Sequence, residues 1–135
     1  LQAAILLAKL PYLAHERGHR ERLAARYDAQ LSGLTEAAPR DAGCDSAWAL
    51  YTIRSSKRDA IRQALADRRI AAAVYYHAPV HLHPAYQTFG DGPGSLPVSE
   101  RLAERVLSLP LTAEMSEAEV DRVAQAVGDA LAGST

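Results

Sequence analysis

The sequence has a single cysteine, Cys44, so it can form no internal disulfide bond. A chain without disulfides is typical of a reducing compartment, and we therefore predict a cytoplasmic location. The longest apolar runs cover residues 3–8 and 70–76, and both are far too short to cross a bilayer as a helix. These features exclude a disulfide scaffold and predict that membranes are not partners.

Neither sign of charge is in excess, because 15 Lys and Arg residues face 16 Asp and Glu residues. The cations include only two lysines, Lys9 and Lys57. Acidic residues are interspersed among the arginines, so no basic stripe indicates nucleic acid as a partner. The chain has 135 residues, of which 48% are hydrophobic and 23% are charged. This length and composition are ordinary for one soluble globular domain.

Hydrophobic periodicity and turn residues predict an α+β fold, a small three-stranded sheet of antiparallel type with helices packed on it. Helices are expected at residues 2–10, 14–31, 58–68, 98–105 and 116–131, and strands at 47–54, 70–76 and 106–109. Residues 35–46 and 77–96 are rich in proline, glycine and small polar residues and are predicted to be loops. The second of these is long, and long loops are often functional.

Particular residues set the ends and faces of the expected helices. Pro11 removes a backbone donor and should kink the first helical segment. Ser116 and Glu119 form a capping box that should begin the last helix, and Gly33 is a plausible end for the second. The residues expected on buried helix faces are Leu23, Tyr27, Leu31, Leu34, Val120, Val123, Ala124 and Val127.

One short motif points to zinc. His15, Glu16 and His19 match H-E-x-x-H, in which two histidines bind zinc and the glutamate activates water. Gly18 weakens the helix that carries the motif, and Arg17 and the arginine at position 20 place positive charge beside any metal. The competing interpretation is a charged helix face exposed to solvent. A small zinc hydrolase that uses this motif is therefore one hypothesis for function, ranked below the two given at the end of this subsection.

Three further histidines, His77, His81 and His83, lie within seven residues. They could bind a metal, or they could line a polar pocket and donate hydrogen bonds to an anionic ligand. We favour a ligand pocket for His81, with surface or supporting roles for His77 and His83. The glycines that follow, in the segment GDGPG at residues 90–94, predict turns and not a phosphate-binding nest.

The second half of the chain contains AAVYYHAPVHLHPAY at residues 72–86. This string resembles V-Y-Y-P-x-P-L-H-x-Q-P-A-Y, a segment of the DegT/DnrJ/EryC1/StrS family of PLP-dependent aminotransferases, which act on nucleotide-linked keto sugars. Other matches follow in family order: LQAAI at 1–5, AARY at 24–27, WALY at 48–51, LPVSE at 96–100, VLSLP at 106–110 and MSEAEV at 115–120. The resemblance covers nearly the whole chain.

The resemblance implies that the chain is the C-terminal small domain of a fold-type I aminotransferase. Residues 1–34 would be a helical segment, kinked at Pro11, that links to a large domain, and residues 35–135 would be the small α/β domain. The chain starts at Leu1 as if in mid-helix, so we expect a piece of a longer protein. The missing large domain would hold PLP through its lysine, and the full-length protein would be a homodimer.

The family also implies the reaction and the site. Glutamate usually supplies the amino group, and a nucleotide-linked keto sugar receives it, with PLP as the electron sink. On this basis Tyr76 and His81, and more weakly Tyr75, are expected to face the substrate; no residue of this chain is expected to be catalytic, to bind the cofactor or to bind a metal. This chain alone should be inactive.

The sequence departs from the family pattern at several positions, including Ala71 and Ala73 where the family often has glycine. Ala49 stands where the family has histidine, His77 replaces a proline, and His83 replaces a glutamine. The departures at Ala49 and His77 motivate an alternative function, a non-catalytic module that binds a sugar nucleotide or a partner chain.

Overall fold

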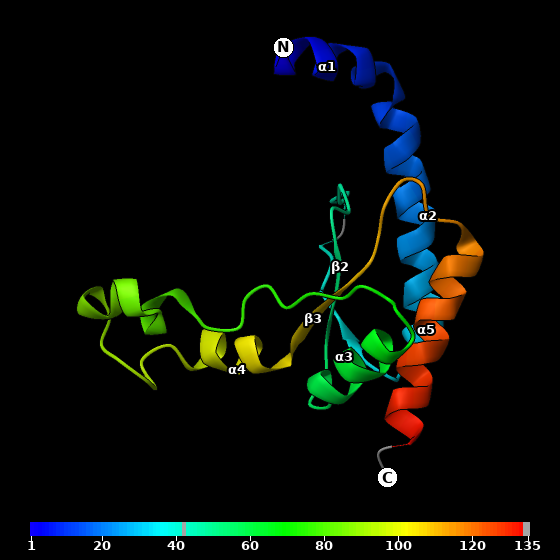
Figure 1. The fold of residues 1–135 in the computed structure, drawn as a ribbon. Helices are drawn as coiled ribbons and strands as arrows, with labels where there is room; N and C mark the ends of the chain where they lie inside the picture. The colour runs from blue at the N-terminus through cyan, green and yellow to red at the C-terminus, as the bar shows by residue number, and fades with distance from the viewer. Residues whose placement is uncertain (42, 134–135) are drawn as a thin grey trace.

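The chain folds into a three-stranded antiparallel sheet with helices packed against it, which confirms the predicted α+β class (Figure 1). The structure is a computed structural model that describes residues 1–41 and 43–133. Residues 42 and 134–135, which belong to the predicted 35–135 unit, lie outside the described residues. The α-helices are α1 (Gln2–Lys9), α2 (Leu13–Leu31), α3 (Arg58–Asp67), α4 (Pro97–Arg105) and α5 (Glu117–Ala132). The strands are β1 (Glu36–Ala37), β2 (Tyr51–Arg54) and β3 (Val106–Leu109).

The sheet has the order β1-β2-β3, with β2 in the centre. Tyr51 pairs with Leu109 and Ile53 with Leu107, so the buried positions of β2 and β3 share one register. Alternate residues of a strand point to the same face, and this pairing therefore presents one apolar face to the helices. The polar residues Thr52 and Ser108 also pair, and their hydroxyl oxygens lie 2.9 Å apart.

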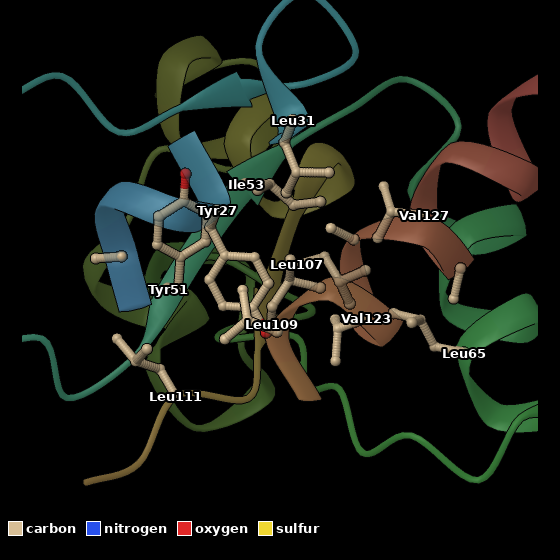
Figure 2. Close-up of a cluster of buried hydrophobic side chains, with 14 of the residues drawn as sticks. Tyr27, Leu31, Tyr51, Ile53, Leu65, Leu107, Leu109, Leu111, Val123 and Val127 are labelled. Atoms are coloured by element: carbon tan, nitrogen blue, oxygen red, sulfur yellow. The ribbon is translucent and has the colours of Figure 1, made fainter. Parts of the chain in front are cut away.

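The core lies between this sheet and helices α2, α3 and α5 (Figure 2). Figure 1 shows α2 and α5 side by side along one side of the molecule, and α3 packs against α5. The rings of Tyr27 and Tyr51 stack with centroids 4.7 Å apart. Each buried hydroxyl has an acceptor: Tyr27 donates to the carbonyl oxygen of Pro110, and Tyr51 donates to the carboxylate of Asp28. The rings thus fill the core without leaving an unpaired polar group.

Helix α1 stands apart from this core. A 3-10 helix, Leu10–Tyr12, separates α1 from α2 and contains Pro11, which removes one backbone donor at this point. Figure 1 shows that the chain turns sharply here, so that α1 projects away from the sheet. None of the residues of α1 is buried. Among the described residues, no helix combines the length and the apolar character needed to cross a membrane.

Four expectations about local structure were wrong. The strand predicted at residues 47–54 begins only at Tyr51. Residues 70–76 form no strand, because only Ala73 bridges to Ser108 of β3. The third strand is instead β1, in a segment predicted to be a loop. Leu34 is 47% exposed because α2 ends at Leu31 and Gly33, at φ +75°, turns the chain out of the helical register.

The last helix begins as predicted. Ser116 Oγ accepts a hydrogen bond from the backbone N–H of Glu119, and the Glu119 carboxylate accepts one from the backbone N–H of Ser116. This reciprocal cap satisfies two donors at the start of α5. The predicted inward residues Val120, Val123, Ala124 and Val127 are all buried.

Arg26 of α2 and Asp121 of α5 join the two helices at their surface. Arg26 Nε and Nη2 donate to the two carboxylate oxygens of Asp121 at 2.5 and 2.7 Å, and Gln30 also donates to this carboxylate. The hydrogen bond from Arg26, and then that from Gln30, lower the pKa of Asp121 from 3.8 to about 2. These hydrogen bonds therefore stabilise the fold only when the Asp121 carboxylate is ionised.

The pair of Arg26 and Asp121 should make the free energy of unfolding depend on pH in the acidic range. A carboxyl whose pKa is lower in the folded state stabilises the fold fully above 3.8 and loses that contribution as the pH falls towards 2. We expect Asp121→Asn to flatten the decline of the unfolding free energy in this window, measured by urea denaturation at several pH values. In an Arg26→Met background the same substitution should change the pH dependence much less. An unchanged acid slope in Asp121→Asn would contradict the assignment.

Candidate functional site

The predicted site residues lie where the chain leaves the core. Val74 is still buried, and the bridge between Ala73 and Ser108 holds this point against β3. The next residues, Tyr75 and Tyr76, begin the projecting segment, which we define as residues 75–96. It contains the 3-10 helices η2 (Val80–Leu82) and η3 (Pro84–Phe89) and returns to the body through α4. Figure 1 shows it extending away from the sheet, with α4 beneath it in that view.

The structure brings the three predicted site residues to one open cleft of about 370 Å³. One side of the cleft is formed by the projecting segment and the other by α4 and the start of β3. The lining includes Tyr75, Tyr76, His81, Leu96, Ser99 and Leu102. The lining is mostly apolar and carries a few polar atoms, which is typical of a ligand pocket.

The two tyrosines are available to a ligand. Tyr76 is 75% exposed and Tyr75 is 50% exposed, and their rings meet edge to face with centroids 5.6 Å apart. Tyr76 also lines a second, more apolar cavity of about 400 Å³ together with His77, His83 and Tyr86. It therefore stands between two hollows, where its ring can stack on a flat ligand and its hydroxyl can bond to a polar one.

His81 is placed differently from the tyrosines. Only 8% of its side chain is exposed, and its Nε2 lies 3.0 Å from Oε1 of Glu100 in α4. The hydrogen bond from His81, and then that from the backbone N–H of Gly94, hold the pKa of the Glu100 carboxyl below its usual value. His81 thus lines the cleft while one of its ring nitrogens is already paired within the protein.

Sequence reasoning did not find Glu100 or the α4 side of the cleft. Glu100 lies in the first turn of α4, and its carboxylate accepts from the backbone N–H of Leu96, the residue that precedes the helix. An acidic residue in the first turn of an expected helix indicates capping. Nothing in the spacing from position 81 to position 100 indicated that the same carboxylate would meet the histidine.

The zinc interpretation is not supported. His19 Nε2 lies 2.8 Å from the carbonyl oxygen of Met115, and its Nδ1 lies 3.1 Å from Nη2 of Arg22, so both ring nitrogens have partners. In the described part of the chain, no group of three or more histidine, cysteine or acidic residues is placed to hold a metal ion. His19 is thus engaged within the protein, and the described residues place no third candidate ligand beside the H-E-x-x-H match.

The second group of histidines, at positions 77, 81 and 83, does not face one common centre. His81 pairs with Glu100, whereas the ring of His83 lies 5.9 Å from that of Tyr86 and accepts a hydrogen bond from the backbone N–H of Ala85. The three histidines of this segment thus lie in different surroundings. His81 belongs to the first cleft, and His77 and His83 belong to the second.

Comparison with known proteins gives one family. Residues 1–128 match the model of the DegT/DnrJ/EryC1/StrS aminotransferase family. The erythromycin biosynthesis sensory transduction protein EryC1 of Saccharopolyspora erythraea is 41% identical over 128 residues, which are 91% of this chain and 34% of that protein. The dTDP-3-amino-3,4,6-trideoxy-alpha-D-glucose transaminase of Streptomyces venezuelae is 40% identical over 132 residues, 94% of this chain and 34% of that enzyme.

Solved structures agree with the sequence match. A DegT DnrJ EryC1 StrS aminotransferase from Brucella abortus superposes with a TM-score of 0.88 at 41% identity, covering 95% of this chain and 34% of that one. The ntda protein of Bacillus subtilis, solved with bound cofactor PMP, superposes with a TM-score of 0.81 at 28% identity, covering 97% of this chain and 32% of that one. The chain therefore spans about a third of the length of the relatives it matches and has the fold of that part.

The residues of this chain do not by themselves fit the cofactor of the family. A pyridoxal cofactor is held through a lysine amine. Lys9 lies in the last turn of α1, and Lys57 Nζ donates to the carbonyl oxygen of Leu131 near the end of α5. Neither lysine lines either cleft of the projecting segment. No chemical step through the cofactor can therefore be derived from these residues.

Proposed function

This chain belongs to the DegT/DnrJ/EryC1/StrS aminotransferase family, and from this we propose that it is the C-terminal part of a PLP-dependent aminotransferase. The proposed enzyme transfers an amino group from glutamate to a nucleotide-linked keto sugar. The observation that carries the proposal is the open cleft that gathers Tyr75, Tyr76 and His81 on the projecting segment. The Streptomyces venezuelae relative is a transaminase of a dTDP-linked sugar, which supports the substrate class.

In this proposal the chain contributes one side of the active site and performs none of the chemistry. Tyr76, the most exposed of the three residues, stacks on or hydrogen-bonds the sugar nucleotide, and Tyr75 supports its ring. The large domain of the full-length protein supplies the cofactor and its lysine in the cytoplasm, where we place the enzyme. Bringing the reacting groups together in one orientation is the contribution of such binding residues.

The large domain is also the proposed partner of α1. Ile5, Leu6 and Leu7 of this helix are 54%, 67% and 69% exposed, so α1 presents apolar side chains that this chain does not cover. Exposed apolar patches of this kind mark interaction sites. The matched relatives have about two thirds of their length outside the aligned part, which is the polypeptide we propose to cover α1. A homodimer of the full-length protein is part of the same proposal.

A graft tests the function directly. We would replace the aligned 132 residues of the Streptomyces venezuelae transaminase by this chain and assay the graft in that enzyme's own reaction. The graft should be active, and Tyr76→Ala should lower kcat/KM for the sugar nucleotide about tenfold to a hundredfold, because a hydrogen bond and a stacking surface are lost. Phe89→Ala is the matched control, since Phe89 is 86% exposed in the same segment and lines neither cleft.

The alternative function predicts a different result. If the chain is a non-catalytic module, the isolated 135 residues should bind a dTDP-sugar saturably, with NMR shifts concentrated at Tyr75, Tyr76 and His81. The proposal expects no saturable binding by the isolated chain, because the open cleft is only part of the active site and the large domain supplies the rest. A folded, cofactor-loaded graft without activity, together with tight binding by the isolated chain, would favour the module.

A further inference from the structure

Glu100 is the one carboxylate that joins both ends of the projecting segment among the described residues. Near the start of that segment it pairs with His81 Nε2 at 3.0 Å. Near the end it accepts from the backbone N–H of Gly94 at 2.9 Å to Oε1 and 3.0 Å to Oε2, and from the backbone N–H of Leu96 at 3.2 Å. Three donors that lie up to 15 positions apart in the chain thus share one acceptor.

The pairing fixes which nitrogen of His81 carries a proton. An ionised carboxylate only accepts hydrogen bonds, so Nε2 of His81 must be the donor. In the neutral imidazole the other nitrogen, Nδ1, is then an acceptor. With Nε2 committed to Glu100, Nδ1 is the ring nitrogen that remains for a ligand in the cleft. This differs from the sequence-based expectation that the histidine donates to an anionic ligand.

Gly90 lies close to the same histidine. A Cβ atom at Gly90 would lie 3.1 Å from the Cβ atom of His81 and 3.3 Å from its carbonyl oxygen. The backbone of Gly90 has a φ of −120°, which any residue can adopt, so glycine is favoured here by the limited space and not by the backbone conformation. The ring of His81 is therefore held by Glu100, and its backbone lies close to Gly90, where a side chain would force a small shift.

From these contacts we propose that Glu100 is a positioning residue of the cleft. It holds His81 as the Nε2–H tautomer and keeps Nδ1 as an acceptor for a hydroxyl or amide donor of the ligand, a group that a sugar ring carries and a diphosphate does not. It also joins the two ends of the projecting segment, so that the tyrosine side of the cleft keeps its place relative to α4. The inference deepens the proposed function and rests on it for the identity of the ligand alone.

The tautomer can be measured on this chain without any ligand. In ¹⁵N NMR spectra at neutral pH, His81 should give the Nε2–H pattern. Glu100→Ala should convert this pattern to a mixture and should speed hydrogen exchange at the Gly94 and Leu96 amides about tenfold. Glu100→Gln keeps an oxygen acceptor and should restore the tautomer, and Glu104→Ala, an exposed position of the same helix, should change neither readout. An Nδ1–H pattern in the unchanged chain, or an Nε2–H pattern that persists in Glu100→Ala, overturns the proposal.

The graft tests the consequence for the ligand. Glu100→Ala should raise KM for the sugar nucleotide about tenfold with a smaller change in kcat, and Glu100→Gln should recover most of the loss. A changed tautomer with an unchanged KM would overturn the positioning role. An inactive parent graft would instead count against the proposed function, and the tautomer measurement would then decide the present inference by itself. A general folding defect in Glu100→Ala is separated by the Glu100→Gln variant, which keeps the acceptor.

Discussion

Replacing Leu109 by alanine should lower the free energy of unfolding by about 2–5 kcal/mol. Leu109 is fully buried in β3, opposite Tyr51 in the register of the sheet. Figure 2 shows it within the same buried cluster as Tyr27, Tyr51 and Val123, which come from α2, β2 and α5. The substitution removes apolar contacts and leaves a cavity where three elements meet, and the stacked tyrosines can close it only in part.

The same substitution at an exposed position provides the control. Leu7 of α1 is 69% exposed, and Leu7→Ala should change the unfolding free energy by no more than about 0.5 kcal/mol. Both variants would be compared with the parent chain by urea denaturation followed by circular dichroism. A total stability of about 5–15 kcal/mol is usual for a domain, so the change at Leu109 is a large part of it. Equal effects at the two positions would show that the core is not where the structure places it.

Residues 47–54 and 70–76 show why one strand prediction was right for Tyr51–Arg54 and the other was wrong throughout. The segment that contains β2 alternates buried and half-buried residues from Tyr51 to Arg54, and such alternation is a local signal. The apolar run from Ile70 lacks it, and only Val74 within the run is buried. A short apolar run fits a strand or a packed loop equally well. Which of the two forms depends on how many backbone bridges the run makes to β3, and here it makes the single bridge from Ala73 to Ser108.

The strand β1, which was predicted to be a loop, has no local signal in the sequence. β1 consists of Glu36 and Ala37, both exposed, so it has no hydrophobic pattern to detect. Its position depends on pairing with β2 and on ion pairs from Glu36 to Arg54 at 3.3 Å and to Arg105 at 2.7 Å. Edge strands of this kind are defined by their neighbours, which are distant in sequence.

The residues of the cleft could likewise be predicted from sequence only in part. Tyr75, Tyr76 and His81 are close together in sequence, and the family resemblance of residues 72–86 was sufficient to select them. Whether each faces a ligand stays a prediction. Their surroundings depend on α4, because Glu100 takes one nitrogen of His81 while Tyr76 stays exposed. Sequence can therefore name candidate side chains, whereas the hydrogen-bonding role left to each one is set by tertiary contacts.

Introducing a charge on α1 should have a large effect in the graft and almost none in the isolated chain. Leu6 is 67% exposed here, so Leu6→Glu should change the unfolding free energy of the isolated chain by no more than about 0.5 kcal/mol. In the graft, the proposed large domain covers α1, and the substitution both removes a buried leucine and buries a carboxylate. We expect the thermal midpoint of the graft to fall by about 5 °C or more, with loss of cofactor and activity.

Two matched variants separate this explanation from others. Leu6→Met conserves apolar volume and should leave both the graft and the isolated chain nearly unchanged. Gln125→Glu adds the same charge at an exposed position of α5 and should be tolerated in both. The contrast between contexts is the informative result, because a purely local effect on α1 would lower stability equally in each. If Leu6→Glu leaves the midpoint of the graft unchanged, then α1 is not the surface that the large domain covers, and its exposed leucines need another partner.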